Sequence, residues 1–338
     1  DGLGQNARLG DQVNLSSRMG DAMGGEVISL SKDVTIIQPD APLTGVSLGD
    51  EALLDGPFQI SPSDAWIGRI VDANGGPMDG RFLPRGENPR SILGAPPNPA
   101  QRRALGRRLE TSMSVFNTLL PIVRGQRLGL FSGSGVGKSS LLAHFASHME
   151  ADVIVIALIG ERGRELRHFV ETTLGKKGMA RSVIVAATSD QNPLLRRRCA
   201  LTAMSVAEHF RDQGKHVLFL ADSITRLAEA HREIAVAAGE APALRGFPAS
   251  TSHLIMSLCE RAGPGLDGGG DITALFSVLV AASDMDEPIA DIMRGVLDGH
   301  VVLDRTIAER GRYPAIDAVR SVSRSLPEAA NEKENELI

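Results

Sequence analysis

From about residue 122 onward, short apolar runs alternate with longer stretches that repeat apolar residues at helical spacing. The runs are rich in Val, Ile and Leu and read RLGLF, DVIVIALIG, RSVIVAATS, HVLFLADS, ITALFSVLVA and HVVLD. Near-continuous apolar runs are typical of strands buried on both faces, because an exposed face would require alternating polar residues. The pattern therefore predicts an α/β fold with a mostly parallel sheet and helices on the outside.

Before residue 122 the pattern is different and falls into two parts. Residues 1–61 contain short strand-like runs, among them EVISL, VTIIQ and GPFQI, which Gly, Pro and Asp separate. This pattern predicts a small all-β module, either a barrel or part of one. The stretch over residues 72–103 lacks hydrophobic periodicity and is rich in Pro, Gly and Arg. Such a composition is typical of an irregular surface segment.

The two ends of the sequence indicate that it is a piece of a longer protein. The chain begins with Asp rather than Met. Its last residues, PEAANEKENELI, are acidic and helix-prone, and they predict the start of a further helical unit. We therefore expect three parts: a partial β-barrel module over 1–61, an α/β core over 62–326 and the start of a helical domain over 327–338.

Composition limits the class of function. Hydrophobic residues make up 42% of the 338 residues and the net charge is −5, which is typical of a globular protein. The two cysteines, Cys199 and Cys259, have neither metal-binding nor redox spacing, which fits a reducing compartment. Aromatic residues are scarce at 4%, which argues against a stacking surface for nucleic acid. No apolar run approaches the ~18 residues of a membrane span.

The sequence SGSGVGKSS is similar to a phosphate-binding loop with one departure, because Ser132 stands where the strict pattern has glycine. It follows the strand RLGLF and precedes a helix whose apolar stripe includes Leu141 and Phe145, which is the context that the motif requires. Lys138 would reach the β- and γ-phosphates of a nucleotide, and Ser139 would offer its hydroxyl to Mg²⁺. The predicted nucleotide-binding residues of the loop are Gly133, Ser134, Gly135, Val136, Gly137, Lys138, Ser139 and Ser140.

Two carboxylates follow buried strands further along the chain. Asp222 ends the run HVLFLAD, and Glu161 directly follows VIVIALIG. Because parallel strands end at one edge of a sheet, both should lie near the loop, Asp222 serving Mg²⁺ and Glu161 polarising the attacking water. Arg162 and Arg164 should keep Glu161 ionised. Taken alone, Asp222 would also fit the cap of a turn, and Glu161 a solvated charged loop.

Six motifs in one order then resemble a known family: GSGVGKS, IGERGRE, ADSITR, RGFPAS, EPIADIMRGVLDGHVVLDR and RYPAIDAVRSVSR. Together they are similar to the catalytic-subunit family of rotary ATP synthases, and within it to the type III secretion ATPases, most of all those of flagellar export. The resemblance covers about residues 62–326. It implies a RecA-like P-loop NTPase core that forms a hexameric ring with nucleotides bound between subunits.

The resemblance also implies roles that the residues alone do not indicate. Arg162 matches an arginine near the γ-phosphate, and Tyr313 in RYPAID matches an aromatic that stacks on adenine. Arg324 in SVSR matches the arginine that reaches into the neighbouring subunit's site. Phe247 departs from the Tyr that relatives often carry, and the helical C-terminal domain of the family would follow residue 338. The roles given above for Lys138, Ser139, Glu161 and Asp222 agree with the resemblance.

The predicted function is that of a motor of flagellar type III protein export that hydrolyses Mg-ATP. It would act as a homo-hexamer at the inner membrane, with regulator, stalk and export-gate proteins and with export substrates and their chaperones. Three alternatives remain: a virulence-type secretion ATPase, a non-catalytic nucleotide-holding ring subunit and a hexameric nucleic-acid translocase. Glu161 argues against the second, which needs no carboxylate at that position. Against the third, residues 1–61 contain a single Phe and more acidic than basic residues.

Overall fold

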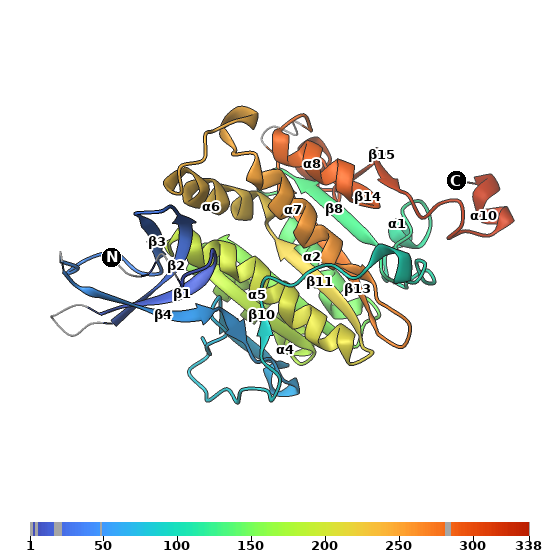
Figure 1. The fold of residues 1–338 in the computed structure, drawn as a ribbon. Coiled ribbons are helices and arrows are strands. Elements are labelled where there is room, and N and C mark those ends of the chain that lie inside the picture. Colours follow the sequence, from blue (N-terminus) through green and yellow to red (C-terminus); the bar gives the residue numbers. More distant parts are fainter. Residues whose placement is uncertain (1–2, 4–5, 17–21, 48, 281–284, 338) are drawn as a thin grey trace.

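The fold is built on one mostly parallel sheet (Figure 1). The computed structural model describes residues 3, 6–16, 22–47, 49–280 and 285–337. The nine-stranded sheet has the order β15-β14-β8-β13-β11-β9-β10-β6, with β12 paired to β13 outside this path. The pairs β12/β13 and β14/β15 are antiparallel and the other pairs are parallel, which confirms the predicted sheet. The strands are β6 (Arg69–Asp72), β8 (Arg127–Ser132), β9 (Val153–Glu161), β10 (Ser182–Thr188), β11 (His216–Asp222), β12 (Gly263–Pro264), β13 (Asp271–Leu279), β14 (Gly299–Leu303) and β15 (Ile316–Ser323).

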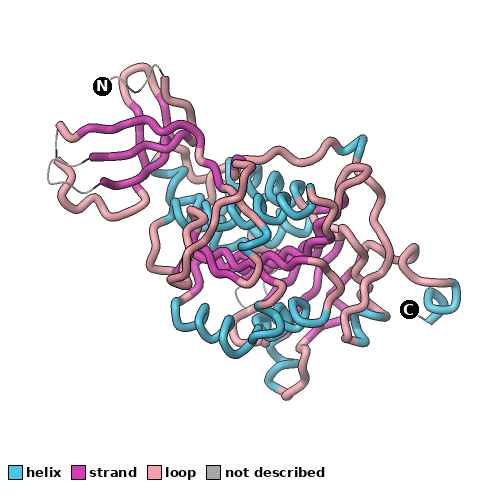
Figure 2. The backbone as a smooth tube through the Cα atoms, turned by 90° about the horizontal axis from the view of Figure 1, so that it is seen from below, coloured by secondary structure: helices cyan, strands magenta, loops and turns pink. Residues whose placement is uncertain are grey.

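Helices cover both faces of this sheet, as Figure 2 shows. One face packs against α5 (Pro193–Asp212), α6 (Ile224–Ala237), α7 (Ser250–Arg261) and α8 (Pro288–Val296). The other packs against α1 (Ser114–Asn117), α2 (Lys138–His148), α3 (Gly163–His168), the π-helix η4 (Phe169–Leu174), α4 (Gly175–Met179) and α9 (Arg305–Glu309). Further short helices are η2 (Asp64–Trp66), η3 (Pro99–Gln101), η5 (Leu244–Gly246) and α10 (Glu332–Leu337).

Burial on both faces explains the near-continuous apolar runs. In β9, Val155 and Ala157 belong to the core beneath α5 and its neighbours, whereas Ile154 and Ile156 belong to the core on the α2 side. All four side chains are fully buried. Since successive strand residues point to opposite faces, a strand between two helical layers needs an apolar residue at every position.

The N-terminal module is an open sheet rather than a closed barrel. Its four strands have the order β3-β2-β1-β4 and are antiparallel throughout. Among the described residues, β3 and β4 form the two edges and do not pair with each other, so the module is not a closed barrel, and the open sheet is compatible with the expected part of one. Closure depends on pairing between distant strands, which the local pattern does not encode. The strands are β1 (Asp11–Ser16), β2 (Ala22–Leu30), β3 (Thr35–Pro39) and β4 (Glu51–Pro57), and the small pair β5 (Gln59–Ile60) and β7 (Arg90–Ser91) follows.

A buried ion pair fastens the irregular segment to the helices. Arg261 at the end of α7 is 2% exposed, and its guanidinium donates to both carboxylate oxygens of Glu208 in α5, at 2.8 and 2.7 Å. The same guanidinium donates to the carbonyl oxygen of Ile92 at 2.7 Å and to the Ser205 hydroxyl at 2.8 Å. One side chain therefore joins α5, α7 and the irregular segment that precedes β8.

Both cysteines are buried and free. Cys199 lies in α5 and Cys259 in α7, each fully enclosed by the core. Burial raises the pKa of both thiols far above the usual range. In the part of the chain that the structure describes, no helix combines the length and the apolar character that crossing a membrane requires.

Candidate functional site

Three parallel strands bring the predicted site residues to one edge of the sheet. The P-loop strand β8 pairs with β13, β13 pairs with β11, and β11 pairs with β9. Asp222, the last residue of β11, is in register with Leu158 of β9, three residues before Glu161. The carboxyl ends of such strands form the ligand-binding edge of an open α/β sheet.

The phosphate loop connects β8 to α2 in a conformation that requires its glycines. Gly135 has a φ of 78° and Gly137 a φ of 89°, the left-handed region that favours glycine. The helix α2 begins at Lys138, so its N-terminal N–H groups point toward the loop. Ser132 is fully buried at the end of β8, paired between β13 and β14, where a small residue fits. The missing glycine therefore precedes the turn itself.

A cavity of about 390 Å³ opens above this loop. It is lined by every predicted residue of the loop except Val136, whose side chain is buried in the core behind it. Glycine backbone and small side chains at this position leave room for phosphate oxygens. The lining residues are Gly133, Ser134, Gly135, Gly137, Lys138, Ser139, Ser140, Gly160, Glu161, Arg162, Glu165, Ser189, Arg226 and Leu279.

Asp222 is held by two partners. The Lys138 ammonium forms an ion pair with its Oδ1, and the Ser277 hydroxyl donates to the same oxygen at 2.7 Å. The side chain of Asp222 is 6% exposed, and a buried carboxylate needs such partners to offset the cost of desolvation. Ser277, from β13, was missed by the sequence reasoning, although it is one of two hydroxyl residues within the apolar run ITALFSVLVA, which was a usable signal.

Glu161 has a strongly perturbed pKa. Burial, and secondly the neighbouring Asp222 carboxylate, raise the pKa of Glu161 to about 7, against a smaller opposing effect of Lys138. The expectation that Arg162 and Arg164 would keep Glu161 ionised was therefore wrong. The Arg162 side chain is 80% exposed and donates to Glu165 at 3.1 Å, so its charge faces solvent and a different carboxylate.

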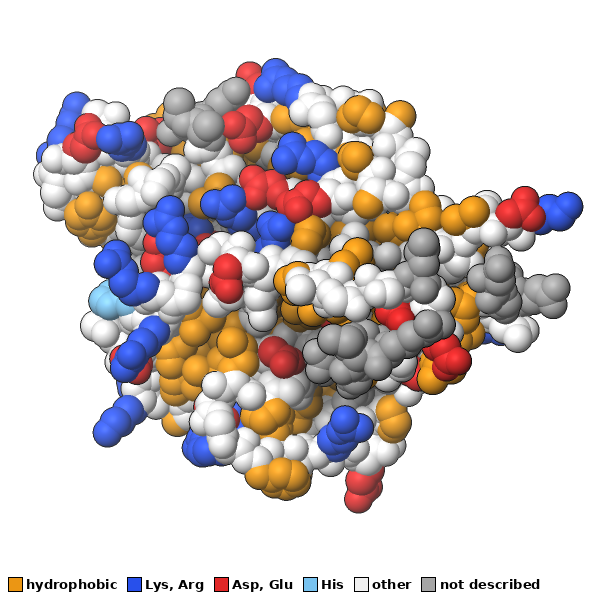
Figure 3. Space-filling view, turned by 90° about the vertical axis from the view of Figure 1, so that its left-hand side faces the viewer, with side chains coloured by type: hydrophobic (Ala, Val, Ile, Leu, Met, Phe, Trp, Pro, Cys, Tyr) orange, Lys and Arg blue, Asp and Glu red, His pale blue; other side chains and the backbone are white. Residues whose placement is uncertain are grey.

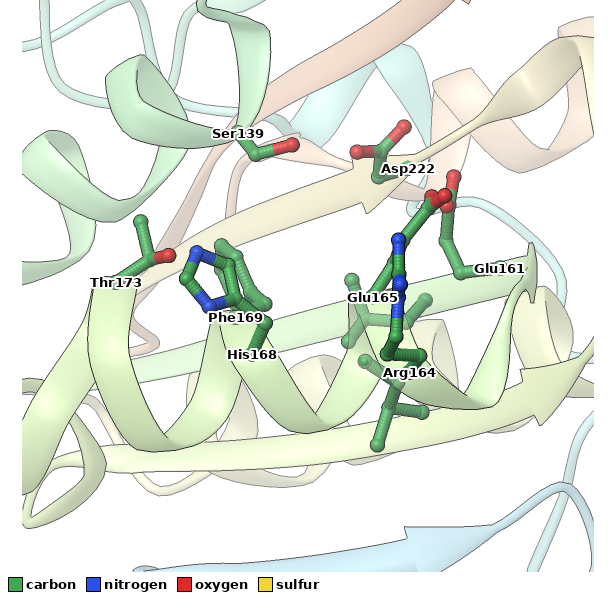
Figure 4. A pocket seen from close by; sticks show the side chains of 10 residues that line it. Ser139, Glu161, Arg164, Glu165, His168, Phe169, Thr173 and Asp222 are labelled. Atoms are coloured by element: carbon green, nitrogen blue, oxygen red, sulfur yellow. The ribbon is translucent and has the colours of Figure 1, made fainter.

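A second cavity of about 480 Å³ adjoins the first (Figure 4). Glu161, Glu165 and Asp222 converge on it from β9, α3 and β11, and the Ser139 hydroxyl lies on the α2 side. Phe169 and other apolar side chains extend the cavity along α3 and η4. Its polar end thus combines a hydroxyl with carboxylates at the phosphate loop. The full lining is Ser139, Leu158, Glu161, Arg164, Glu165, Leu166, His168, Phe169, Thr173 and Asp222.

The donor set fits Mg²⁺ bound together with a nucleotide rather than a resident metal. Ser139 and Asp222 supply a hydroxyl and a carboxylate, the hard oxygen ligands that Mg²⁺ prefers. Within the described residues, no group of three or more His, Cys, Asp or Glu side chains could hold a metal by itself. Magnesium commonly binds through one or two protein ligands plus substrate phosphates and water, which is what this edge provides.

Tyr313 lies beside the phosphate loop, whereas Arg324 lies away from it. A Cβ added to Gly137 would be 3.2 Å from Cδ1 of Tyr313, and Tyr313 is 62% exposed, so it is accessible from solvent beside the loop. Arg324 follows β15, and its guanidinium donates to the carbonyl oxygen of Arg294 at 3.4 Å. It lines neither of the two cavities. Its role at a neighbour's site stays a prediction.

Arg226 is a further cation at the loop that the sequence reasoning missed. It lies in the first turn of α6 and lines the loop cavity. Its guanidinium donates to Glu229 at 2.8 Å, and its aliphatic part lies 3.5 Å from where a Cβ of Gly160 would stand. Its position four residues after Asp222, in ADSITR, was the available signal.

Comparisons with known proteins agree with this geometry. The ATP synthase alpha/beta family, nucleotide-binding domain, matches residues 112–323. The flagellum-specific ATP synthase of Agrobacterium fabrum is 45% identical over 338 residues, 100% of this chain and 71% of that protein. That of Salmonella typhimurium is 50% identical over 268 residues, 79% of this chain and 59% of that protein. The assembled ATPase EscN from the enteropathogenic E. coli type III secretion system superposes with a TM-score of 0.90 at 37% identity, covering 98% of this chain and 79% of EscN.

Proposed function

The chain belongs to the ATP synthase alpha/beta family, and on this premise we propose that it is an ATP hydrolase that drives flagellar type III protein export. The observation that carries the hydrolase assignment is the placement of Glu161, which lies at the cavity of the phosphate loop with a pKa of about 7. A carboxylate with a pKa near the working pH is well matched to orienting and deprotonating water.

The geometry supports in-line hydrolysis. The loop N–H groups and Lys138 would bind the β- and γ-phosphates, so Lys138 would exchange its contact with Asp222 for phosphate oxygens. Ser139 and Asp222 would hold Mg²⁺, which supplies positive charge against these phosphates. Water oriented by Glu161 attacks the γ-phosphorus, its proton passes to the carboxylate, and the bond to the β–γ bridging oxygen breaks to leave ADP and phosphate. Tyr313 would stack on the adenine.

We further propose that the active form is a homo-hexameric ring, with Arg324 of one subunit completing the site of the next. EscN, which this chain resembles in fold, is described as an assembled ATPase and in complex with its central stalk EscO, which supports self-assembly and a stalk partner here. Regulator and export-gate proteins, export substrates with their chaperones, a cytoplasmic location at the inner membrane and the domain limits at residues 61 and 326 belong to the same proposal.

The alternatives have less support. The flagellum-specific ATP synthase of Agrobacterium fabrum is 45% identical to this chain, against 37% for EscN, which favours flagellar over virulence-type export. Glu161 at the loop cavity argues against a non-catalytic ring subunit. On the face seen in Figure 3, Asp and Glu side chains lie among the described Lys and Arg side chains, which does not favour a nucleic-acid partner.

The decisive experiment is a Glu161→Gln variant. We expect ATP binding to be retained while turnover falls by roughly 100-fold or more, because the isosteric amide cannot accept the proton. A flagellar export mutant complemented with this variant should stay non-motile. Glu171→Gln, at an exposed carboxylate on η4 whose partner is Arg167, is the matched control and should hydrolyse ATP normally. Near-normal turnover of Glu161→Gln would refute the assignment. A wild-type chain that restores effector secretion to a virulence-type export mutant, but not motility to the flagellar export mutant, would favour the virulence-type system.

A further inference from the structure

We infer that Asn192 is a positioning residue through which the N-terminal sheet sets the position of Glu161. Asn192 ends the loop between β10 and α5, and its side chain makes two different contacts. Oδ1 accepts a hydrogen bond from the N–H of Leu195 at 3.1 Å and so caps α5. Nδ2 donates to the carbonyl oxygen of Pro39, the last residue of β3, at 2.8 Å. One side chain thus joins the N-terminal sheet to the first turn of α5.

The loop that Asn192 ends is bonded to the catalytic strand. Thr188 of β10 is in register with Glu161, and the N–H of Ser189 donates to the Glu161 carbonyl oxygen at 3.0 Å. Gln191 closes the turn, because its Oε1 accepts from the Thr188 N–H at 2.9 Å and its own N–H donates to the Thr188 carbonyl oxygen at 3.1 Å. Ser189 also lines the phosphate cavity. A displacement of Asn192 is therefore passed through a short, closed turn to the Glu161 backbone.

The residue before Glu161 touches the same helix start. Gly160 has a φ of 68°, and a Cβ placed on it would be 3.4 Å from Cδ of Arg196. Arg196 in turn donates from Nε to the Gln191 carbonyl oxygen at 3.2 Å, and its Nη2 pairs with Glu233 at 2.9 Å. Gly160 and the carbonyl oxygen of Glu161 thus both contact the segment that Asn192 anchors.

The N-terminal sheet also contacts α5 through buried ion pairs, which should hold the sheet and the helix in a fixed relative position. Arg198 is 2% exposed and donates to Glu26 of β2 at 3.1 Å and to Gln12 of β1 at 2.8 Å. Arg197 also pairs with Glu26. Because Arg198 and Glu26 are buried and paired with each other, the sheet and the helix start should move as one body. A load on the N-terminal sheet would then reach Glu161 through Asn192.

The rate of hydrolysis should be sensitive to a small displacement of the N-terminal sheet. Misplacing a reacting group by an ångström can cost about 100-fold in rate, while nucleotide binding depends chiefly on the loop and α2. This expected kinetic effect rests on the proposed hydrolase function. The predicted signature is a lower kcat with little change in nucleotide affinity.

Two substitutions test the hydrogen bond from Asn192 to Pro39 separately from the cap of α5. Asn192→Ser and Asn192→Asp both keep a good capping oxygen. Neither should keep the bond to the Pro39 carbonyl, because an ionised Asp has no donor and the Ser hydroxyl, one bond shorter than the amide, does not reach that oxygen while it caps α5. We expect kcat to fall roughly tenfold in Asn192→Ser and further in Asn192→Asp, whose carboxylate would face that carbonyl oxygen, with affinity for a non-hydrolysable ATP analogue changed less than about twofold. The matched control is Asn98→Ser, a cap of η3 that accepts from Ala100 at 3.0 Å, and it should keep normal kcat.

Hydrogen exchange of the Ser189 amide tests the contact without hydrolysis. In the nucleotide-free protein this amide should exchange faster in Asn192→Ser than in wild type, and it should not change in Asn98→Ser. Wild-type kcat in both Asn192 variants, or unchanged Ser189 exchange, would overturn the inference. A wild-type protein that binds ATP without hydrolysing it would refute the proposed function, and the exchange measurement would still decide whether Asn192 holds the Glu161 strand.

Discussion

Glu161 is placed between opposing influences on one proton. Burial and the Asp222 carboxylate favour its neutral form, while Lys138 favours the charged form, and the resulting pKa is about 7. Lys138 is itself engaged with Asp222. The protonation state of this one side chain should therefore govern both turnover and stability near neutral pH.

Turnover should depend on pH through this residue. Because the ionised carboxylate is needed to accept a proton from water, kcat/KM should fall as the pH is lowered through about 7, the pKa of Glu161 in the nucleotide-free protein. We expect a single-proton limb between about pH 8 and pH 6 when initial rates are measured at Mg-ATP concentrations well below KM. Nucleotide affinity measured on Glu161→Gln over the same range serves as the control. A flat profile would contradict the role of Glu161 as the proton acceptor.

The free energy of unfolding should depend on pH in the opposite sense to that given by an ion-paired carboxylate, whose pKa is lowered on folding. The folded pKa of Glu161 lies above its ordinary value of 4.5, so the folded protein keeps a proton that the unfolded chain releases. The free energy of unfolding should then decrease as the pH rises from about 4.5 to about 7. Without nucleotide, Glu161→Gln should melt at a higher temperature than wild type at pH 8, and the two should converge toward pH 5. Glu171→Gln should follow the wild type, and a wild type that is the more stable at pH 8 would contradict the shift.

At this scale the sequence identified residues that belong to local motifs. Lys138 and Ser139 lie in a loop whose spacing defines their position, and Glu161 and Asp222 could be placed because parallel strands end at one edge. Ser277 contacts Asp222 from another strand, and such a contact depends on the sheet order rather than on neighbouring letters.

The charge expectation for Glu161 failed for a related reason. Arg162 and Arg164 are adjacent to it in sequence, but the chain turns into α3 at that point, and Arg162 pairs with Glu165 instead. Proximity along the chain is a poor guide to electrostatic environment where a strand ends and a helix begins.

At the scale of elements, the Arg261–Glu208 ion pair should contribute strongly to the stability of the packing between α5 and α7. Arg261→Ala would leave the buried Glu208 carboxylate with only a longer contact to Arg90, at 3.8 Å, and would remove the donor to Ile92, so we expect a loss of about 3–5 kcal/mol in the free energy of unfolding. Urea denaturation monitored by circular dichroism measures it. The double variant Arg261→Met with Glu208→Leu should be less destabilised than the single variant, because no charge remains buried. A single variant within about 1 kcal/mol of wild type would contradict the assigned role.

Elements differed in how well they could be predicted. The central strands were readable because burial on both faces leaves an apolar run that few other elements produce. The small N-terminal strands were readable individually, but their arrangement as an open sheet depends on which edges meet. The π-helix η4 had no local signal that we recognised.

For the whole molecule, the role proposed for Arg324 implies a site completed by a second subunit. Arg324→Ala should lower turnover by roughly 10³-fold or more, with unchanged nucleotide affinity in the monomer. Wild-type activity per subunit should rise with protein concentration as subunits assemble. Equal specific activity at all concentrations would contradict a shared site.

Mixing two inactive variants provides a sharper test of the shared site. Glu161→Gln subunits retain Arg324, and Arg324→Ala subunits retain Glu161, so random mixing in a head-to-tail ring would give about a quarter of interfaces with both residues. Activity should therefore reappear on mixing. The control is a mixture of Glu161→Gln with the double variant Glu161→Gln, Arg324→Ala, which should stay inactive.

Because the thiols of Cys199 and Cys259 are enclosed, a new surface cysteine could be labelled without removing them. Their high pKa values and complete burial should protect both from maleimide reagents while the protein stays folded. A cysteine placed at Val319, which is 96% exposed on β15, would then take up a fluorophore selectively. Energy transfer between such labels on donor and acceptor subunits would report association close to Arg324 in real time, with both native cysteines left in place.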